Sequence, residues 1–345
     1  MNIFYHLSHI DLDGYGCQYL TTKCFENIEC YNANYGPEVK ARLEEIINSI
    51  KRNQFVSSKA ENIILITDLN LTTKEANWLQ REASSVGAKI VLLDHHISGE
   101  NTSNQFTWYY LDDSKSATLL TYEWLRENYD FDKDGKYQKI VKAINAIDIW
   151  LSEDELFEFG KVGLGMISGA KEINRTLFPK EDRDLKLFLI ESAREFLEKE
   201  NAHILLDNNL HKLKKEFFKQ KYDNTKDNLV AQFVSKLLSD DKQRLTIEYK
   251  GHKGLLGYNL GNTSILGNTF LVDNPEYDFY MDINYRGNFS LRSNNKLDVS
   301  KMAQEIGNGG GHPNASGGKI KEYKDSFVYS DIKKFVQEYI DGKGK

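Results

Sequence analysis

The stretch Lys89-Ile90-Val91-Leu92-Leu93-Asp94-His95-His96 places one acidic residue and two histidines directly after a run of apolar residues. Two other apolar runs, at residues 3–7 and 63–67, also lead to acidic or imidazole side chains. The segment 8–14 (Ser-His-Ile-Asp-Leu-Asp-Gly) follows the first run, and Asp68 follows the second. Short apolar runs are typical of buried strands. Because ligands gather beyond the carboxyl ends of the strands in open parallel sheets, the pattern predicts oxygen and nitrogen ligands along one sheet edge.

The elements between these runs indicate an α/β fold. A strand is expected at residues 28–32, and amphipathic helices are expected at residues 15–25, 37–50, 72–87, 115–128 and 136–147. Alternation of strands and helices is typical of a parallel sheet that helices cover on both faces.

The second half of the chain has a different pattern. A charged, helical stretch at residues 182–222 could connect two lobes. Short strands are expected at residues 245–249, 255–258, 277–285 and 288–292, with a hairpin turn at residues 286–288. A helix at residues 299–306 precedes a glycine-rich segment, and Asp331 is expected to cap a last helix that runs to Ile340.

Composition narrows the functional class. The 345 residues carry a formal charge of −6, which disfavours a protein that holds long nucleic acid on a broad basic surface. Cys17, Cys24 and Cys30 form no CxxC pair, so reduced thiols are expected rather than a zinc site. No apolar stretch approaches the length of a membrane span, and a cytoplasmic protein without a membrane partner is the default expectation.

Several acidic and imidazole side chains at strand exits suggest a metal centre. Carboxylates that are brought together repel one another and normally require cations. Any single aspartate here could be a helix cap or turn residue, and a lone histidine is usually structural, but the recurrence at three strand exits favours a shared function. Mixed oxygen and nitrogen ligands suit manganese, with magnesium, cobalt or zinc as substitutes. The candidates are His9, Asp11, Asp13, Asp68, Asp94, His95, His96 and Asp148.

These residues resemble the motifs of a known family. Asp94-His95-His96 looks like the signature of the DHH phosphoesterases, and His9-x-Asp11-x-Asp13-Gly14 is similar to their first motif. Asp68 is similar to the second motif and Asp148 to the fourth. The segment 309–317 (Gly-Gly-Gly-His-Pro-Asn-Ala-Ser-Gly) resembles the GGGH motif of the associated DHHA1 domain. The resemblance implies a parallel-sheet DHH domain at residues 1–185, a helical linker at 186–227, and a smaller α/β DHHA1 domain with a mixed sheet at 228–345.

The resemblance also implies roles for the residues of the first domain. One divalent ion would be held by His9, Asp11 and Asp68. The second ion would be held by Asp13, Asp68, His95 and Asp148, so that Asp68 bridges both. Asp94 would orient a ligand histidine through its ring nitrogen. His96 would face the scissile phosphate, and both Asp94 and His96 are therefore assigned to catalysis. His9 departs from the pattern of many short-oligonucleotide members because it lies two residues before Asp11 rather than four.

In the second domain, the resemblance implies substrate binding by Arg292, Gly309, Gly310, Gly311 and His312. Successive glycines can expose backbone N–H groups to an anion, and a histidine after them can donate to a phosphate. The alternatives are a flexible turn for the glycines and a surface salt bridge for the arginine.

The implied function is metal-dependent hydrolysis of short oligonucleotides or linear dinucleotides such as pApA and pGpG, as in oligoribonucleases that act on nanoRNA, with pAp as a further substrate. Cleavage polarity (3′-5′ or 5′-3′) and homodimer formation stay open. The nearest enzymatic alternative is a RecJ-like single-strand exonuclease, and an inorganic pyrophosphatase is disfavoured because the GGGH segment resembles a different second domain. The alternative that is not an enzyme is a non-catalytic nucleotide-binding sensor.

Overall fold

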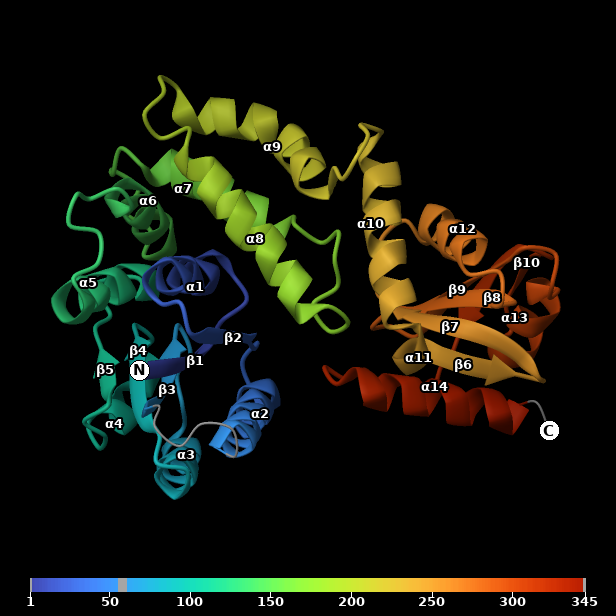
Figure 1. Ribbon diagram of the computed structural model, residues 1–345, viewed down its shortest axis with the longest axis horizontal. Helices are drawn as coiled ribbons and strands as arrows, with labels where there is room; N and C mark the ends of the chain where they lie inside the picture. The colour runs from blue at the N-terminus through green and yellow to red at the C-terminus, as the bar shows by residue number, and fades with distance from the viewer. Residues whose placement is uncertain (1, 55–60, 344–345) are drawn as a thin grey trace. The chain divides into compact units, whose positions relative to one another are not determined.

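The computed structural model describes residues 2–54 and 61–343, which form two compact units. Unit 1 contains Met1–Ala170 and Arg183–Leu210, and unit 2 contains Lys171–Asp182 and His211–Lys345 (Figure 1). The domain boundaries that the sequence suggests at residues 185 and 228 stay a prediction.

Unit 1 is built on a parallel sheet, as predicted. Its strand order is β2-β1-β3-β4-β5, and every neighbouring pair is parallel. The strand order therefore reverses between β1 and β3, which is the point where open α/β sheets place their ligands. The strands are β1 (Asn2–Ser8), β2 (Ile28–Asn32), β3 (Glu61–Thr67), β4 (Lys89–Asp94) and β5 (Tyr109–Leu111).

Several helices near this sheet begin at residues whose side chains cap them. Thr72 and Glu75 form a reciprocal capping box at the start of α3 (Thr73–Ser85), the helix expected at residues 72–87. In α1 (Leu12–Cys24), the side chain of Asp11 accepts from the N–H of Gly14, so the helix begins before the expected residue 15. The other helices are α2 (Pro37–Gln54), α4 (Glu100–Ser103), α5 (Ala117–Tyr129), α6 (Gln138–Asp148) and α7 (Phe157–Ser168), with a 3₁₀ turn η1 (Ile97–Gly99).

The helical spacing in α2 produces a buried apolar face. Val39, Leu43, Ile46, Ile47 and Ile50 are all buried and join one core cluster with residues of β1, β3 and β4. Burial of such a face supplies most of the stability of a helix in a folded protein.

The helical stretch expected at residues 182–222 is two helices rather than one. These are α8 (Pro179–Arg194) and α9 (Ala202–Phe218), and turns occupy the residues between them. Each of the two helices contributes residues to both units.

Unit 2 contains the predicted mixed sheet. Its strand order is β10-β11-β9-β8-β7-β6; β7 and β8 are parallel, and the other neighbouring pairs are antiparallel. The strands are β6 (Thr246–Tyr249), β7 (His252–Tyr258), β8 (Phe279–Ile283), β9 (Asn288–Ser293), β10 (Gly310–His312) and β11 (Ala315–Lys319). The helices are α10 (Lys226–Asp240), α11 (Lys242–Leu245), α12 (Thr263–Asp273), α13 (Val299–Gly307) and α14 (Tyr329–Lys343).

Two local interpretations in unit 2 need correction. The glycine segment is not the flexible turn that the sequence left as an alternative, since residues 310–312 form the edge strand β10 of a hairpin with β11. Asp331 lies in the first turn of α14 rather than before it, so it is not the cap.

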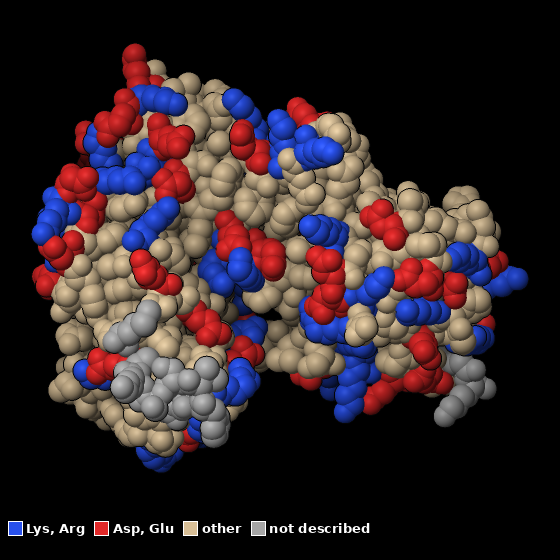
Figure 2. All heavy atoms as spheres, in the orientation of Figure 1, with Lys and Arg blue, Asp and Glu red and all other residues tan. Residues whose placement is uncertain are grey.

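Charged side chains of both signs are interspersed on the face of the molecule drawn in Figure 2. No broad, purely basic area appears among the residues coloured on that face. Within the described part of the chain, no helix is both long and apolar enough to cross a membrane.

Candidate metal centre

The predicted ligands of unit 1 meet at the carboxyl ends of three neighbouring strands. His9 and Asp11 follow β1, Asp68 follows β3, and His95 and His96 follow β4. Because β1, β3 and β4 are adjacent and parallel, their ends converge on one edge, as the sequence pattern predicted.

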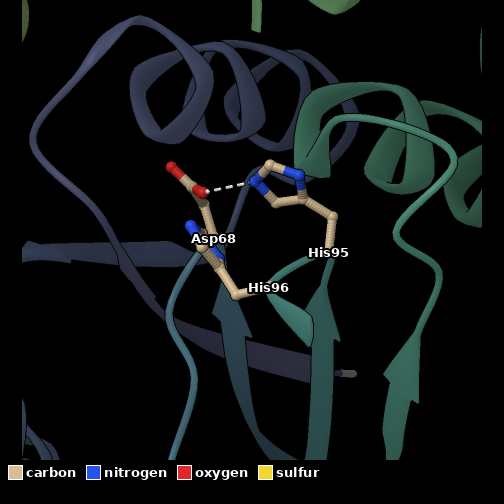
Figure 3. A group of neighbouring side chains, drawn as sticks. All are labelled: Asp68, His95 and His96. Atoms are coloured by element: carbon tan, nitrogen blue, oxygen red, sulfur yellow. Dashed lines mark ion pairs between the residues drawn. The ribbon is translucent and has the colours of Figure 1, made fainter. Parts of the chain in front are cut away.

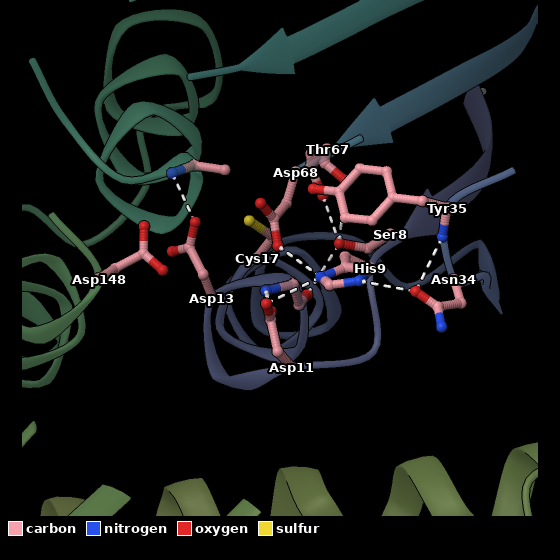
Figure 4. Close-up of polar contacts among 12 residues, drawn as sticks. Ser8, His9, Asp11, Asp13, Cys17, Asn34, Tyr35, Thr67, Asp68 and Asp148 are labelled. Atoms are coloured by element: carbon pink, nitrogen blue, oxygen red, sulfur yellow. Dashed lines mark hydrogen bonds and ion pairs between the residues drawn. The ribbon is translucent and has the colours of Figure 1, made fainter. Parts of the chain in front are cut away.

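His9, Asp11 and Asp68 form one group of side chains that could hold a metal ion. The Nδ1 atom of His9 lies 2.8 Å from Oδ2 of Asp11 and 3.6 Å from Oδ2 of Asp68 (Figure 4). Gly14 is required next to this group, since a Cβ atom at this position would lie 2.4 Å from the carbonyl oxygen of His9. The two-residue spacing between His9 and Asp11 therefore still brings the imidazole to the carboxylates.

A second group surrounds His95. Its Nε2 atom lies 3.4 Å from Oδ1 of Asp68, 3.5 Å from Oδ2 of Asp148 and 3.8 Å from Oδ2 of Asp13. Figure 3 shows the imidazole of His95 directed toward Asp68 from the end of the neighbouring strand. Asp13, His95 and Asp148 could hold an ion together, and Asp68 faces both groups with different oxygens.

The carboxylate of Asp13 is fixed by the N-terminus of α5. Its Oδ2 accepts from the N–H of Ala117 at 2.7 Å, and its Oδ1 accepts from the N–H of Thr118 at 2.8 Å. The side chain of Ser116 caps the same helix by accepting from the N–H of Leu119. Free N–H groups and the helix dipole favour a negative charge here, so α5 holds Asp13 in one orientation and favours its ionised form.

Asp94 contacts His96, and not one of the two histidines, His9 and His95, that the resemblance makes metal ligands. In the structure, the Nδ1–H of His96 donates to Oδ1 of Asp94 at 2.7 Å, and the hydroxyl of Tyr109 donates to Oδ2 at 2.7 Å. The Nε2 atom of His96 accepts from the hydroxyl of Tyr35 at 2.8 Å. Asp94 therefore fixes the ring of His96, which itself lies within ligand range of Asp68 and His95.

Burial and mutual repulsion make the carboxylates of this centre hard to ionise together. Asp68 is 2% exposed, and burial followed by the charges of Asp13 and Asp11 raises its pKa well above the usual range. Burial also raises the pKa of Asp13, and burial with the charges of Asp13 and Asp68 raises the pKa of Asp148 to about 9. A cation in this position would remove the repulsion that causes these shifts.

His9 has the opposite electrostatic environment. Burial disfavours its charged form, but the carboxylates of Asp11 and Asp68 outweigh burial and raise the pKa of His9 to about 10. In return, contact with His9 outweighs burial and lowers the pKa of Asp11 to about 2. A proton on His9 thus takes the place that a cation would otherwise occupy between these carboxylates.

One buried oxygen supports the metal interpretation independently. Oδ2 of Asp68 is fully buried and has no hydrogen-bond partner among the described residues. A buried carboxylate oxygen without a donor is costly unless a cation binds it. The residues present therefore fit a divalent metal centre.

The predicted substrate-binding residues all lie in unit 2. Arg292 is half-buried at the end of β9, where its guanidinium donates to the carbonyl oxygen of Leu291 at 2.7 Å and to Oγ of Ser264 at 2.5 Å. Gly310, Gly311 and His312 form the exposed edge strand β10, and Gly309 precedes it.

Packing within the hairpin also explains why glycine occupies some positions of this segment. A Cβ atom at Gly309 would lie 2.0 Å from the carbonyl oxygen of Gly317, and Gly311 has a φ of +147° with a Cβ position 2.5 Å from the carbonyl oxygen of Ala315. Gly310 is different, because a Cβ atom there would meet only open space. Hairpin packing therefore explains two of the three glycines.

Tyr35 and Tyr109 were not among the predicted residues. Tyr35 follows β2, so its position at a strand exit is the same signal that identified the aspartates. Tyr109 lies on the edge strand β5, which contains only residues 109–111 and gave no clear pattern in the sequence.

Comparison with known proteins agrees with the motifs. The DHHA1 domain family matches residues 273–341, a range that contains Arg292 and the glycine segment. A Helicobacter pylori protein (strain ATCC 700392 / 26695) named 3′,5′-cyclic-nucleotide phosphodiesterase is 44% identical over 343 residues, which is 97% of each chain. The chain belongs to the DHH/DHHA1 phosphoesterase family.

The fold of this DHH/DHHA1 chain also matches a solved structure. A crystal structure of an uncharacterized protein from Helicobacter pylori G27 superposes with a TM-score of 0.91 at 43% identity, and the match covers 99% of this chain and 100% of that chain.

Proposed function

We propose that this protein is a metal-dependent phosphodiesterase that hydrolyses short oligonucleotides or linear dinucleotides, such as pApA and pGpG, to nucleoside monophosphates, with pAp as a further substrate. One observation carries the proposal. Asp68 faces one ligand group with Oδ2 and a second ligand group with Oδ1, which is the arrangement that a carboxylate shared by two ions requires.

The residues of the two groups would divide the ions between them. His9, Asp11 and Asp68 would hold one ion, while Asp13, Asp68, His95 and Asp148 would hold the other. Two adjacent divalent ions, with Mn²⁺ favoured by the oxygen and nitrogen donors, would supply an activated water and neutralise the phosphate charge.

His96 would act directly on the substrate. Its Nδ1–H is committed to Asp94, so only Nε2 remains to contact a phosphate oxygen or exchange a proton, and Tyr35 already contacts that atom. Asp94 would act through His96 by holding its ring and its tautomer.

Unit 2 would bind the other end of the substrate. Arg292 can pair with a phosphate if it gives up its hydrogen bond to Ser264. The exposed strand formed by Gly310, Gly311 and His312 offers backbone and imidazole donors to the substrate, and Gly309 directly precedes this strand.

A 3′,5′-cyclic nucleotide is a second candidate substrate, because the relative that is 44% identical over 97% of this chain has that name. It would also be attacked at a phosphodiester, and the same cluster would serve both reactions.

The test is a comparison of initial rates with added manganese on pApA, pGpG, five-residue RNA, pAp, cyclic AMP, long single-stranded DNA and pyrophosphate. We expect the highest kcat/KM on the dinucleotides or five-residue RNA and two bound metal ions per chain by elemental analysis. Tight dinucleotide binding without product would indicate a sensor instead. A preference for long DNA would indicate a RecJ-like exonuclease, and a preference for cyclic AMP would indicate the second candidate.

A further inference from the structure

A cavity of about 250 Å³ opens beside the metal centre within unit 1. One wall contains the carboxylates of Asp11, Asp13 and Asp148. The other walls contain the apolar side chains of Leu12, Ile144, Ile147, Trp150 and Leu164. The metal ligands thus border a hydrophobic space that the chemistry at the ions does not itself require.

Trp150 is the unusual residue of this cavity. Its exposed fraction is 67%, whereas the other three tryptophans, Trp78, Trp108 and Trp124, all lie in the described chain and are half-buried. Its ring contacts Phe157 nearly at a right angle, with centroids 5.2 Å apart. A large aromatic ring exposed at the mouth of a cavity commonly marks a binding site.

The backbone conformation at Trp150 is one in which a tryptophan does not favour folding. The residue directly follows the C-cap of α6 and has a φ of 57°, which is the left-handed region. The N–H of Leu151 donates to the carbonyl oxygen of Ala146 at 2.7 Å, which completes a helix end that normally has glycine at the position of Trp150. A bulky residue is disfavoured at this position, so its indole needs another reason.

We propose that this cavity is a nucleobase subsite, in which the indole of Trp150 stacks on the base of the nucleotide whose phosphate lies at the metal centre. The proposal rests on the proposed function. Pockets for drug-sized ligands span roughly 300–1,000 Å³, so a cavity of about 250 Å³ suits a single base rather than a whole dinucleotide.

The lining also determines the kind of recognition. Its polar side chains are the carboxylates that would hold metal ions, and its remaining side chains are apolar. Apart from the indole N–H of Trp150, no side chain of the lining is then left to read hydrogen-bonding groups on the base. Stacking on an aromatic ring tolerates every base, so the subsite accepts adenine, guanine and pyrimidines with similar affinity.

Trp150→Gly is a suitable test because glycine is the favoured residue at a left-handed helix end, so the variant is expected to fold with an unchanged or higher Tm. We expect its KM for pApA to rise about tenfold with little change in kcat, since base stacking contributes on that scale. For an analogue that lacks the base next to the scissile phosphate, Trp150→Gly and the wild-type protein should have the same KM. Trp150→Phe keeps an aromatic ring and should retain a nearly normal KM. Tyr110→Ala removes a ring that is 55% exposed on β5, outside the cavity, and is the matched control.

A binding measurement separates this proposal from the proposed function. With magnesium present, AMP should quench the tryptophan fluorescence of the wild-type protein, and ribose 5-phosphate, which differs only in lacking the base, should not. Trp150→Phe should abolish the quenching, and Trp124→Phe should retain it. Quenching without any turnover would overturn the phosphodiesterase assignment but support the subsite. Normal turnover with an unchanged KM in Trp150→Gly, or a marked fall in its Tm, would overturn the subsite alone.

Discussion

The imidazole of His96 donates from Nδ1 to Oδ1 of Asp94 at 2.7 Å, and this bond fixes which ring nitrogen points toward the active site. Asp94 is completely buried and also accepts from the hydroxyl of Tyr109, so its carboxylate cannot turn away. Nε2 of His96 is therefore the nitrogen presented to a substrate.

Asp94→Asn should lower kcat by about 10–100-fold, because the amide cannot hold the His96 tautomer as a carboxylate does. KM and metal content should change little. Steady-state kinetics with manganese and metal analysis are the measurements. Tyr109→Phe retains the bond between Asp94 and His96 and should cause a smaller loss. Equal losses in the two variants would contradict the orienting role of Asp94.

Asp68→Asn should lower activity by more than about 100-fold, since Asp68 would be a ligand to both ions and loss of even an outer partner costs 10–100-fold. Asparagine tolerates the φ of 56° at this position. Without metal, the variant should be more stable than the wild-type protein, with a Tm about 2–4 °C higher in EDTA. The substitution removes one buried carboxylate from a cluster whose members repel one another.

Calorimetric melting with and without manganese checks this prediction. Manganese should raise the Tm of the wild-type protein and much less that of Asp68→Asn. Asp112→Asn, which changes a partly exposed carboxylate of the same unit, is the control. Full activity with normal metal content in Asp68→Asn would refute the bridging role.

His312→Ala should raise the KM for dinucleotides several-fold and leave metal content unchanged, because His312 lies on the exposed strand β10 of unit 2 and the metal centre lies in unit 1. His211→Ala, which changes another exposed histidine of unit 2, should have no effect. A loss confined to kcat, or a variant indistinguishable from wild type, would argue against substrate binding by His312.

Gly310→Ala tests whether a substrate approaches the backbone of β10. The added methyl group meets no protein atom within 4 Å, so the Tm should stay unchanged. If a phosphate contacts this backbone, the methyl group should raise KM about tenfold. Gly342→Ala in α14 also adds a methyl group to open space and provides the control. Identical KM values for both variants would place the substrate elsewhere.

Asp282→Asn should change the pH dependence of stability. Asp282 is 6% exposed in β8, and burial raises its pKa to about 8. The pKa of this group in the unfolded chain is about 3.9, so between about pH 4 and pH 8 the folded protein keeps a proton that the unfolded chain releases. Wild-type stability therefore falls as pH rises through this window, and the loss ends once the folded group ionises.

Asp282→Asn has no such loss. Its free energy of unfolding minus that of the wild-type protein should therefore increase by at least about 1 kcal/mol from pH 5 to pH 8. Urea unfolding in EDTA at both pH values measures this difference. The side-chain amide of the variant would retain an oxygen that can accept from the N–H of Leu260, as the carboxyl group of Asp282 does. Asp331→Asn, at an exposed position, should show no pH-dependent difference. A constant difference between Asp282→Asn and wild type would show that Asp282 is ionised throughout.

The sequence was sufficient to predict the parallel sheet and the gathering of most candidate ligands at one of its edges. Apolar runs and the residues that end them are local features, and adjacent parallel strands must bring their carboxyl ends to one edge. Even the pairing of Asp94 with His96 follows a local rule, because residues two apart in extended backbone point the same way.

Only the tertiary structure decided which distant groups complete the site. Tyr35 meets His96 across 61 positions of the chain, and the N–H groups of α5 meet Asp13 across more than 100. The glycine segment became a strand because β11 lay beside it to pair with, and Trp150 became a cavity wall because α6 ends next to Asp13. Sequence patterns specify how each segment folds and which face it buries, whereas contacts between remote segments depend on how the buried faces pack together.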